Sequence, residues 1–443
     1  MNAGPTVLAH GIGGRQDLPL SLTELVVGAS LALIISFLAL GVLWPQARLD
    51  AAGRAGRPVP AALARLAGAA WWAWTIRLLG LAAAGYFGIG LLGGPDTADN
   101  PTAGALYVLF WVGLAPLSLL LGPVWRALNP LRTLHLLGSL AVRRDPAVGV
   151  RALPAGWGYW PGALGLLAFA WLELVAPDRA TLPVIGAWLA VYATITLAAG
   201  VVYGSTWFDR GDPFEVLSGL VGRLALIGRR NDGVLVWRNP LDGIAALRPA
   251  PGLVAVVVVL LGSTMFDSLT GAPAWLRFVQ ENGLPRTVTG TGGLLAVIGA
   301  VAAAYHLATR AAGRRGRADV DRVPGELAHS IVPIATGYLI AHYYSLLVLE
   351  GQHTVALLSD PLDTGANWLG TANLTVHTGL ITPTGVAALQ ITLIVLGHLL
   401  GTVLAHDRAL RLFPRAQAVR GQVPLLALMV AYTVAGLLLL FAG

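Results

Sequence analysis

The 443-residue sequence contains no cysteine and no lysine, and only 12% of its residues are charged. The absence of cysteine excludes disulfides, thiolate catalysis, iron–sulfur clusters and zinc sites with cysteine ligands. The scarcity of charge excludes an ordinary soluble domain, in which about 25% of residues are charged. In contrast, 56% of the residues are hydrophobic. This balance is typical of a protein whose surroundings are largely lipid.

All 29 basic residues are arginines, and they alternate between the polar gaps that separate the apolar segments. Five gaps carry four to six arginines each, whereas the four gaps between them carry none, one, two and none. Basic side chains are retained on the cytoplasmic side during insertion, so the arginine-rich gaps are expected inside and the others outside. Because the arginines are dispersed, the net charge of +7 indicates contact with anionic lipid rather than with nucleic acid.

The apolar segments predict an all-α polytopic transmembrane bundle that forms one integral domain over residues 1–443. A span needs about 20 mostly apolar residues. Both termini are expected outside the plasma membrane, and residues 1–21 lack the parts of a cleavable signal peptide. Ten spans are predicted, at 22–44, 68–93, 102–122, 159–177, 182–204, 251–269, 290–311, 327–350, 384–404 and 422–442.

Three of the gaps between these spans are long. Those at 123–158 and 205–250 lie on the arginine-rich side and are expected to hold short amphipathic helices on the membrane surface, one of them over 216–227. The external loop 351–383 has acids, amides, tryptophan and turn residues. This composition predicts an ordered loop that could cap a cavity.

The two arginine-rich gaps resemble each other. Trp125 is followed by Asn129-Pro130, and Trp207 is followed by Asp212-Pro213, about 82 residues later. An Asn or Asp before proline suits the start of a helix, because its side chain caps the first turn. The match predicts a tandem repeat in which spans two and three correspond to spans four and five. Such repeats occur in transporters and also in purely structural bundles.

Four histidines fall in the inner half of the last spans, where they are candidate metal ligands. Imidazole binds divalent metals and haem iron, so a shared divalent metal or haem is one interpretation. The alternative is that each imidazole bonds a backbone carbonyl or lies at the interface. The four are His306, His329, His398 and His406.

Asp267 and His342 are the candidate catalytic residues. Asp267 lies near the outer end of its span in a hydroxyl-rich stretch, and His342 lies near mid-membrane beside Tyr343. An ionisable side chain inside a span is costly unless it is paired or hydrated, so each is a functional candidate. The alternatives are an interhelical hydrogen bond for His342 and interfacial hydration for Asp267. Glu173 and Glu350 are further outer acids, for which interfacial hydration is the simpler interpretation.

Several segments resemble a known family; they are Ala9–Pro19, Gly262–Ser268, Ala328–Tyr343, Ser359–Leu362 and Gly397–Leu410. They are similar to actinobacterial polytopic membrane proteins, many of which are labelled fenitrothion hydrolase, an organophosphorus-ester hydrolase. The resemblance spans nearly the whole chain. It implies hydrolysis of organophosphorus or other apolar esters by an activated water, usually on a metal held by histidine and carboxylate. The chain has no His-Glu-x-x-His spacing.

Three functions are therefore compatible with the sequence. The first is a membrane-embedded, metal-assisted ester hydrolase. The second is a transporter or channel for a small solute or ion, which the repeat, Asp267 and His342 favour. The third is a haem- or metal-bearing redox subunit, which the histidines on neighbouring spans favour. In each case the partners are the lipid bilayer and a small molecule.

Overall fold

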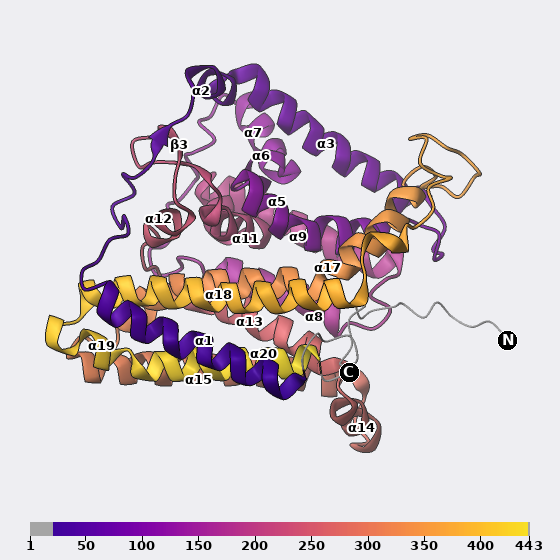
Figure 1. Cartoon of the computed structure of the whole chain (residues 1–443). Helices are drawn as coiled ribbons and strands as arrows, with labels where there is room; N and C mark the ends of the chain where they lie inside the picture. Colours follow the sequence, from indigo (N-terminus) through magenta and orange to yellow (C-terminus); the bar gives the residue numbers. More distant parts are fainter. Residues whose placement is uncertain (1–20, 442–443) are drawn as a thin grey trace.

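The computed structural model describes residues 21–441, which form the all-α polytopic bundle that the sequence predicts (Figure 1). The expectation for the N-terminal tail falls outside the described residues. Within those residues, nine helical segments are long and apolar enough to cross a membrane. They are α1 (Leu22–Leu43), α3 (Ala70–Gly93), α4–η2–α5 (Thr102–Leu121), α9 (Leu182–Tyr203), α13 (Leu253–Thr270), α15 (Arg286–Gly316), α16–η4–α17 (Val323–Leu357), α18 (Pro383–Leu412) and η6–α19–α20 (Arg415–Leu440).

The remaining predicted span, 159–177, corresponds to a shorter helix, α8 (Trp160–Leu174). Its 15 residues give a length of about 22 Å at about 1.5 Å per residue, less than the ~30 Å of a hydrocarbon core. Helix α8 packs against α13 in the interior of the bundle.

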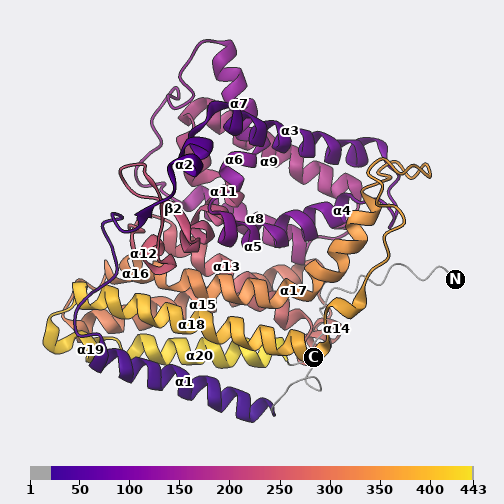
Figure 2. The ribbon, with the colours of Figure 1, turned by 45° about the horizontal axis from the view of Figure 1, so that its top comes forward.

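The long helices run side by side, with α3 toward one edge of the bundle in both views and α1 at the opposite edge in Figure 2 (Figures 1 and 2). Helices α13, α17 and α18 lie between these edges, and α13 is buried along most of its length. The short elements gather mainly at one end of the bundle. The short elements at this end are α2 (Ala61–Gly68), α6 (Trp125–Leu128), α7 (Pro130–Ala141), α10 (Thr206–Gly211), α11 (Pro213–Val221), η3 (Gly222–Leu224) and α12 (Pro240–Ala245). Helix α14 (Pro273–Glu281) and η5 (Thr378–Leu380) lie at the other end.

Gaps that the arginine pattern assigns to one side of the membrane contact one another. Strands β1 (Arg57–Pro58), β3 (Leu235–Trp237) and β2 (Ile227–Arg229) form one antiparallel sheet, in the order β1-β3-β2. Asp407, at the arginine-rich end of α18, accepts hydrogen bonds from the backbone N–H groups of Arg48 (2.6 Å) and Leu49 (3.1 Å). The first, third and last of these gaps therefore share one end of the bundle.

The expectation of a surface helix over 216–227 is wrong. The helix is α11, and eight of its nine residues are buried. Glu215 and Ser218, on its polar side, are buried together with its apolar residues, so the helix lies inside the protein rather than on a membrane surface. Beyond Val221 the chain continues as η3 and strand β2 instead of the predicted helix.

The loop at the opposite end is organised by Asp360. The carboxylate of Asp360 accepts hydrogen bonds from the backbone N–H groups of Thr364 (3.0 Å), Gly365 (2.6 Å) and Ala366 (3.0 Å). The loop is shorter than predicted, because α17 continues to Leu357. It is the orange loop at the right of Figure 1, beside the end of α3.

Helices α17 and α18 approach each other closely through glycines. A Cβ on Gly397 would lie 2.7 Å from the carbonyl oxygen of Pro333, and one on Gly401 would lie 2.7 Å from that of Ser330. The spacing of Gly397 and Gly401 is the small-xxx-small pattern that lets membrane helices pack at short distance. This contact fixes α17, which carries His342, in the bundle.

We predict that Gly397→Ala lowers the free energy of unfolding by about 1–3 kcal/mol, because the added methyl group must displace a backbone carbonyl. Gly299→Ala on α15 is the matched control, since nothing lies within 4 Å of a Cβ there. The control is expected to be neutral or stabilising by up to about 1 kcal/mol. Thermal unfolding in detergent measures both variants, and equal effects would contradict the proposed packing.

Candidate functional site

Asp267 and His342, which are 75 residues apart in the chain, contact each other inside the bundle. Asp267 lies on α13 and His342 on α17, and the imidazole Nε2 is 2.8 Å from Oδ2 of Asp267. The Tyr343 hydroxyl donates a hydrogen bond to the same oxygen at 2.7 Å. The structure thus brings together the two residues that the sequence proposed as catalytic.

Ser268 and Tyr338 extend this contact. The Ser268 hydroxyl lies 3.2 Å from Nδ1 of His342 and 2.8 Å from the hydroxyl of Tyr338. Both nitrogens of the His342 ring therefore have a side-chain partner. We refer to Asp267, Ser268, Tyr338, His342 and Tyr343 as the Asp267 cluster.

Glu173, near the end of α8, joins the edge of this cluster. Its carboxyl group interacts electrostatically with Asp267 and lies within reach of the Tyr343 hydroxyl. The neighbouring segment η2 (Ala105–Val112) is a π-helix of eight residues that packs against α17. A π-helix is rare and is often found at functional sites.

Glu350, the third outer acid, does not reach the Asp267 cluster. It lies on the last turns of α17, half-exposed, with His353 at 3.7 Å. This position agrees with the interpretation of Glu350 as a hydrated interfacial group.

The four candidate metal ligands lie in separate surroundings. His306 is exposed on α15, and His329 lies 3.0 Å from the carbonyl oxygen of Glu326. Nδ1 of His398 lies 2.8 Å from the carbonyl oxygen of Ile394, whereas its Nε2 has no hydrogen-bond partner among the described residues.

His406 lies between the side chain of Gln422 and the carbonyl oxygen of Trp44, each at 3.1 Å. Within residues 21–441, no three histidine or acidic side chains are placed so that they could hold a metal ion. The expected gathering of His306, His329, His398 and His406 is therefore not seen in the described part of the chain. The shared metal site was predicted because the four histidines lie at a similar depth along their helices. In the structure, however, each faces different neighbours.

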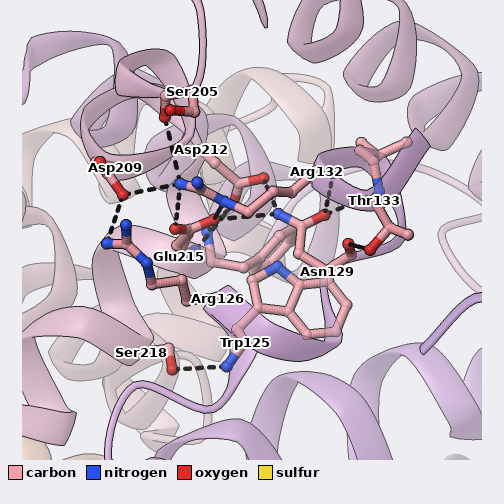
Figure 3. Close-up of polar contacts among 12 residues, drawn as sticks. Trp125, Arg126, Asn129, Arg132, Thr133, Ser205, Asp209, Asp212, Glu215 and Ser218 are labelled. Carbon is pink, nitrogen blue, oxygen red and sulfur yellow. Dashed lines mark hydrogen bonds and ion pairs between the residues drawn. The ribbon is translucent and has the colours of Figure 1, made fainter. Parts of the chain in front are cut away.

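A second buried polar cluster lies where the two similar gaps meet (Figure 3). Asn129 caps α7, and its side chain accepts hydrogen bonds from the N–H groups of Leu131 and Arg132. Asp212 caps α11 in the same way, with the N–H groups of Phe214 and Glu215 as donors. The two caps also contact each other, because the Asn129 amide donates to Asp212 at 3.1 Å.

Arg132 and Glu215 form the second contact between the gaps. The guanidinium of Arg132 donates to both oxygens of Glu215, at 2.6 and 3.0 Å, and to Asp209 at 2.8 Å. Arg126 also pairs with Asp209 at 2.8 Å, on the more exposed side. We refer to Asn129, Arg132, Asp209, Asp212 and Glu215 as the Arg132 network.

Burial governs the electrostatics of this network. Asp212 is fully buried and Glu215 is 5% exposed. Burial raises the pKa of Asp212, and hydrogen bonds from Tyr192, Asn129 and the first turn of α11 oppose that rise. Burial likewise raises the pKa of Glu215, and the charge of Arg132 opposes it. Desolvation disfavours the charged form of each carboxyl group.

A small apolar cavity lies against the helices that carry both clusters. Leu217 and Leu220 of α11, Leu260 of α13, and Thr336 and Leu339 of α17 are among its lining residues. The cavity is thus bounded by the helix of Glu215 and by the two helices of the Asp267–His342 pair.

The sequence did not identify the Arg132 network as a site. The signal was nevertheless present, because the third residue after each cap is charged and the two charges are opposite, Arg132 after Asn129 and Glu215 after Asp212. Comparison of the chain with family models, with curated proteins and with solved structures gives no match in any of the three.

We predict that Arg132→Gln lowers the free energy of unfolding by about 3–5 kcal/mol, because it leaves buried carboxylates without their cation. Arg230→Gln is the control, since the Arg230–Asp232 pair is largely exposed, with Asp232 at 53%, and such pairs contribute about 0–1 kcal/mol. Chemical unfolding in detergent tests the difference. A loss below about 1 kcal/mol for Arg132→Gln would show that the network is not buried as described.

Proposed function

We propose that this multi-pass membrane protein moves a small solute or ion across the bilayer in a step coupled to protonation of the Asp267 cluster. The observation that carries the proposal is the direct Asp267–His342–Tyr343 contact inside the bundle. Two carboxyl groups, Asp267 and Glu173, share this region with one imidazole. Like charges in a low-dielectric interior cannot all remain ionised, so such a cluster takes up and releases protons readily.

The organisation around the cluster supports transport. Short helices with capped N-termini interrupt the bundle at the Arg132 network, and the segments that contain them repeat the same local structures. Repeated segments of this kind are common in transporters, whose halves move against each other during alternating access. The small apolar cavity between the helices of the two clusters marks a point at which these helices are not fully packed.

The hydrogen-bond pattern also suits a proton relay. His342 contacts Asp267 through Nε2 and Ser268 through Nδ1, and Ser268 contacts Tyr338. A histidine between a carboxylate and hydroxyl groups can accept a proton on one nitrogen and release one from the other. The relay extends from α13 to α17, so a change of charge at Asp267 alters the contact between these helices.

A second candidate function, ester hydrolysis, is favoured by one specific observation. The contacts Ser268–His342–Asp267 connect a hydroxyl, an imidazole and a carboxylate in series, as in serine hydrolases. Here the Ser268 oxygen would bond to phosphorus or carbon, its proton would pass to Nδ1 of His342, and the alkoxide or aryloxide would leave. Water would then release the acyl or phosphoryl group.

This second candidate agrees with the resemblance to organophosphorus hydrolases, but two features favour transport. Ser268 lies within the helix α13 and is 7% exposed, so a bulky ester has no direct approach to its hydroxyl. Tyr338 already occupies one side of that hydroxyl. Nucleophilic serines in hydrolases are presented on exposed turns instead.

We predict that Asp267→Asn and His342→Gln lower proton-coupled uptake by about 10²-fold or more, because each removes a proton-exchanging group. Proteoliposomes that contain a pH-sensitive dye and an imposed membrane potential report the flux, in the presence of small carboxylates, amines and inorganic phosphate in turn. Glu350→Gln is the control, since Glu350 lies outside the cluster. A wild-type flux no greater than that of empty vesicles for every solute, or an unaffected Asp267→Asn, would refute the proposal.

Ser268→Ala separates the two functions. If the protein is a transporter, this variant keeps a measurable part of its uptake, because Asp267 and His342 remain in contact and only the hydroxyl partner of Nδ1 is lost. If it is a hydrolase, the purified wild-type protein turns over a nitrophenyl phosphotriester, and Ser268→Ala loses about 10³-fold or more of that activity. Turnover of this kind without any solute flux would replace the first proposal by the second.

A further inference from the structure

The two repeats contact each other through equivalent residues. Helix α7 packs against α3 of its own repeat and against α9 of the other, and α11 packs against α8 of its own and against α5 of the other. Asn129 bonds its equivalent Asp212, and Arg132 bonds its equivalent Glu215. A pseudo-twofold relation therefore passes through the Arg132 network, with opposite charges at the equivalent positions.

The buried part of this network carries one more negative than positive charge. Arg126 and Asp209 balance each other at the more exposed side. Inside, the single cation Arg132 faces the two carboxyl groups of Asp212 and Glu215. One proton would neutralise the buried part, and desolvation favours the neutral form.

We infer that the Arg132–Glu215 contact is a proton-sensitive gate that holds the two repeats together at the arginine-rich end of the bundle. The inference rests on the proposed transport function, because it concerns the path that leads from the Asp267 cluster to this end. With both carboxyl groups ionised, Arg132 bridges the repeats and the gate is closed. When the pair takes up one proton and that proton lies on Glu215, Arg132 loses its bidentate partner and keeps Asp209, so the contact between the repeats loosens.

The groups around Asp212 and Glu215 leave these two carboxyl groups as the site of the proton. The titratable and charged side chains that face it are Arg132 of α7, Arg126 of α6, Asp209 of α10 and Tyr192 of α9. The Tyr192 hydroxyl donates to Asp212 at 2.7 Å, and the Asn129 amide lies 3.1 Å from Asp212 and 3.4 Å from Glu215.

Burial raises the pKa of both carboxyl groups. The pair therefore binds the proton at a higher pH than an ordinary carboxyl group does, and it releases the proton again as the pH rises further.

Difference infrared spectroscopy after a pH change tests the proton site. Acids of the Asp267 cluster would contribute bands of their own, so the parent protein carries Asp267→Asn and Glu173→Gln. In lipid, this parent is expected to show the carbonyl band of a protonated buried carboxyl group on acidification. Adding Glu215→Gln or Asp212→Asn should remove that band, whereas adding Asp232→Asn, in an exposed hairpin, should retain it. A band that persists in both variants, or no band in the parent, would overturn the inference. Size-exclusion profiles identify any variant that fails to fold.

Cysteine cross-linking tests the gate, because the chain has no cysteine of its own. Ser118 of α5 and Ser218 of α11 belong to different repeats, and their hydroxyl oxygens are 2.8 Å apart. Ser118→Cys with Ser218→Cys should oxidise readily at a fixed, mildly alkaline pH. Adding Glu215→Gln, which imitates the protonated state, should slow the oxidation several-fold, whereas adding Asp232→Asn should not.

An oxidation rate that Glu215→Gln leaves unchanged would show that the pair does not hold the repeats together. Neither readout needs a transported solute. If the infrared band and the cysteine oxidation both fail to respond to Glu215→Gln while Asp267-dependent uptake is intact, the gate alone is overturned. If the protein transports nothing, both readouts can still be measured, so the two proposals fail separately.

Discussion

The structure depends on one constraint, which is that a charge buried in a low-dielectric interior must be paired or neutralised by a proton. The chain has few charged residues, and two of the places where it buries them are clusters of several polar groups. At the Asp267 cluster, an imidazole and hydroxyl groups surround a carboxylate between α13 and α17. At the Arg132 network, one guanidinium serves two buried carboxyl groups between the repeats. Neither arrangement is needed to close an apolar bundle, so each points to function.

The helices that carry the two clusters line the same apolar cavity. Helix α11 carries Glu215 and also lines the apolar cavity, and α13 and α17 line the same cavity and carry Asp267 and His342. The glycine contacts between α17 and α18 fix the position of His342, whereas the contact between the repeats depends on polar groups that can change charge. On the proposed function, the part of the bundle held by these glycine contacts would face a part whose cohesion responds to protonation, which is the division that alternating access requires.

Much of the fold was predictable from the sequence, because hydrophobic length and arginine placement report directly on membrane insertion. Asp267 and His342 were also predictable as candidates, since any ionisable group in a span is costly. The histidine set shows the limit of that approach. Depth along a helix can be read from residue number, but the rotation of each helix depends on packing, so His306 faces outward while His398 and His406 meet different neighbours. The Arg132 network was missed because its helices were assigned to the surface. Their packing against helices of both repeats buries the network.

The central claim, that Asp267 and His342 exchange a proton inside the membrane, is tested most directly by nitrogen NMR of ring-labelled histidine in lipid over a series of pH values. The spectrum of His342→Gln identifies the signals of His342. The account predicts that these signals move with pH, and that Asp267→Asn shifts them and changes their pH dependence. Signals of His342 that neither pH nor Asp267→Asn alters would contradict the account.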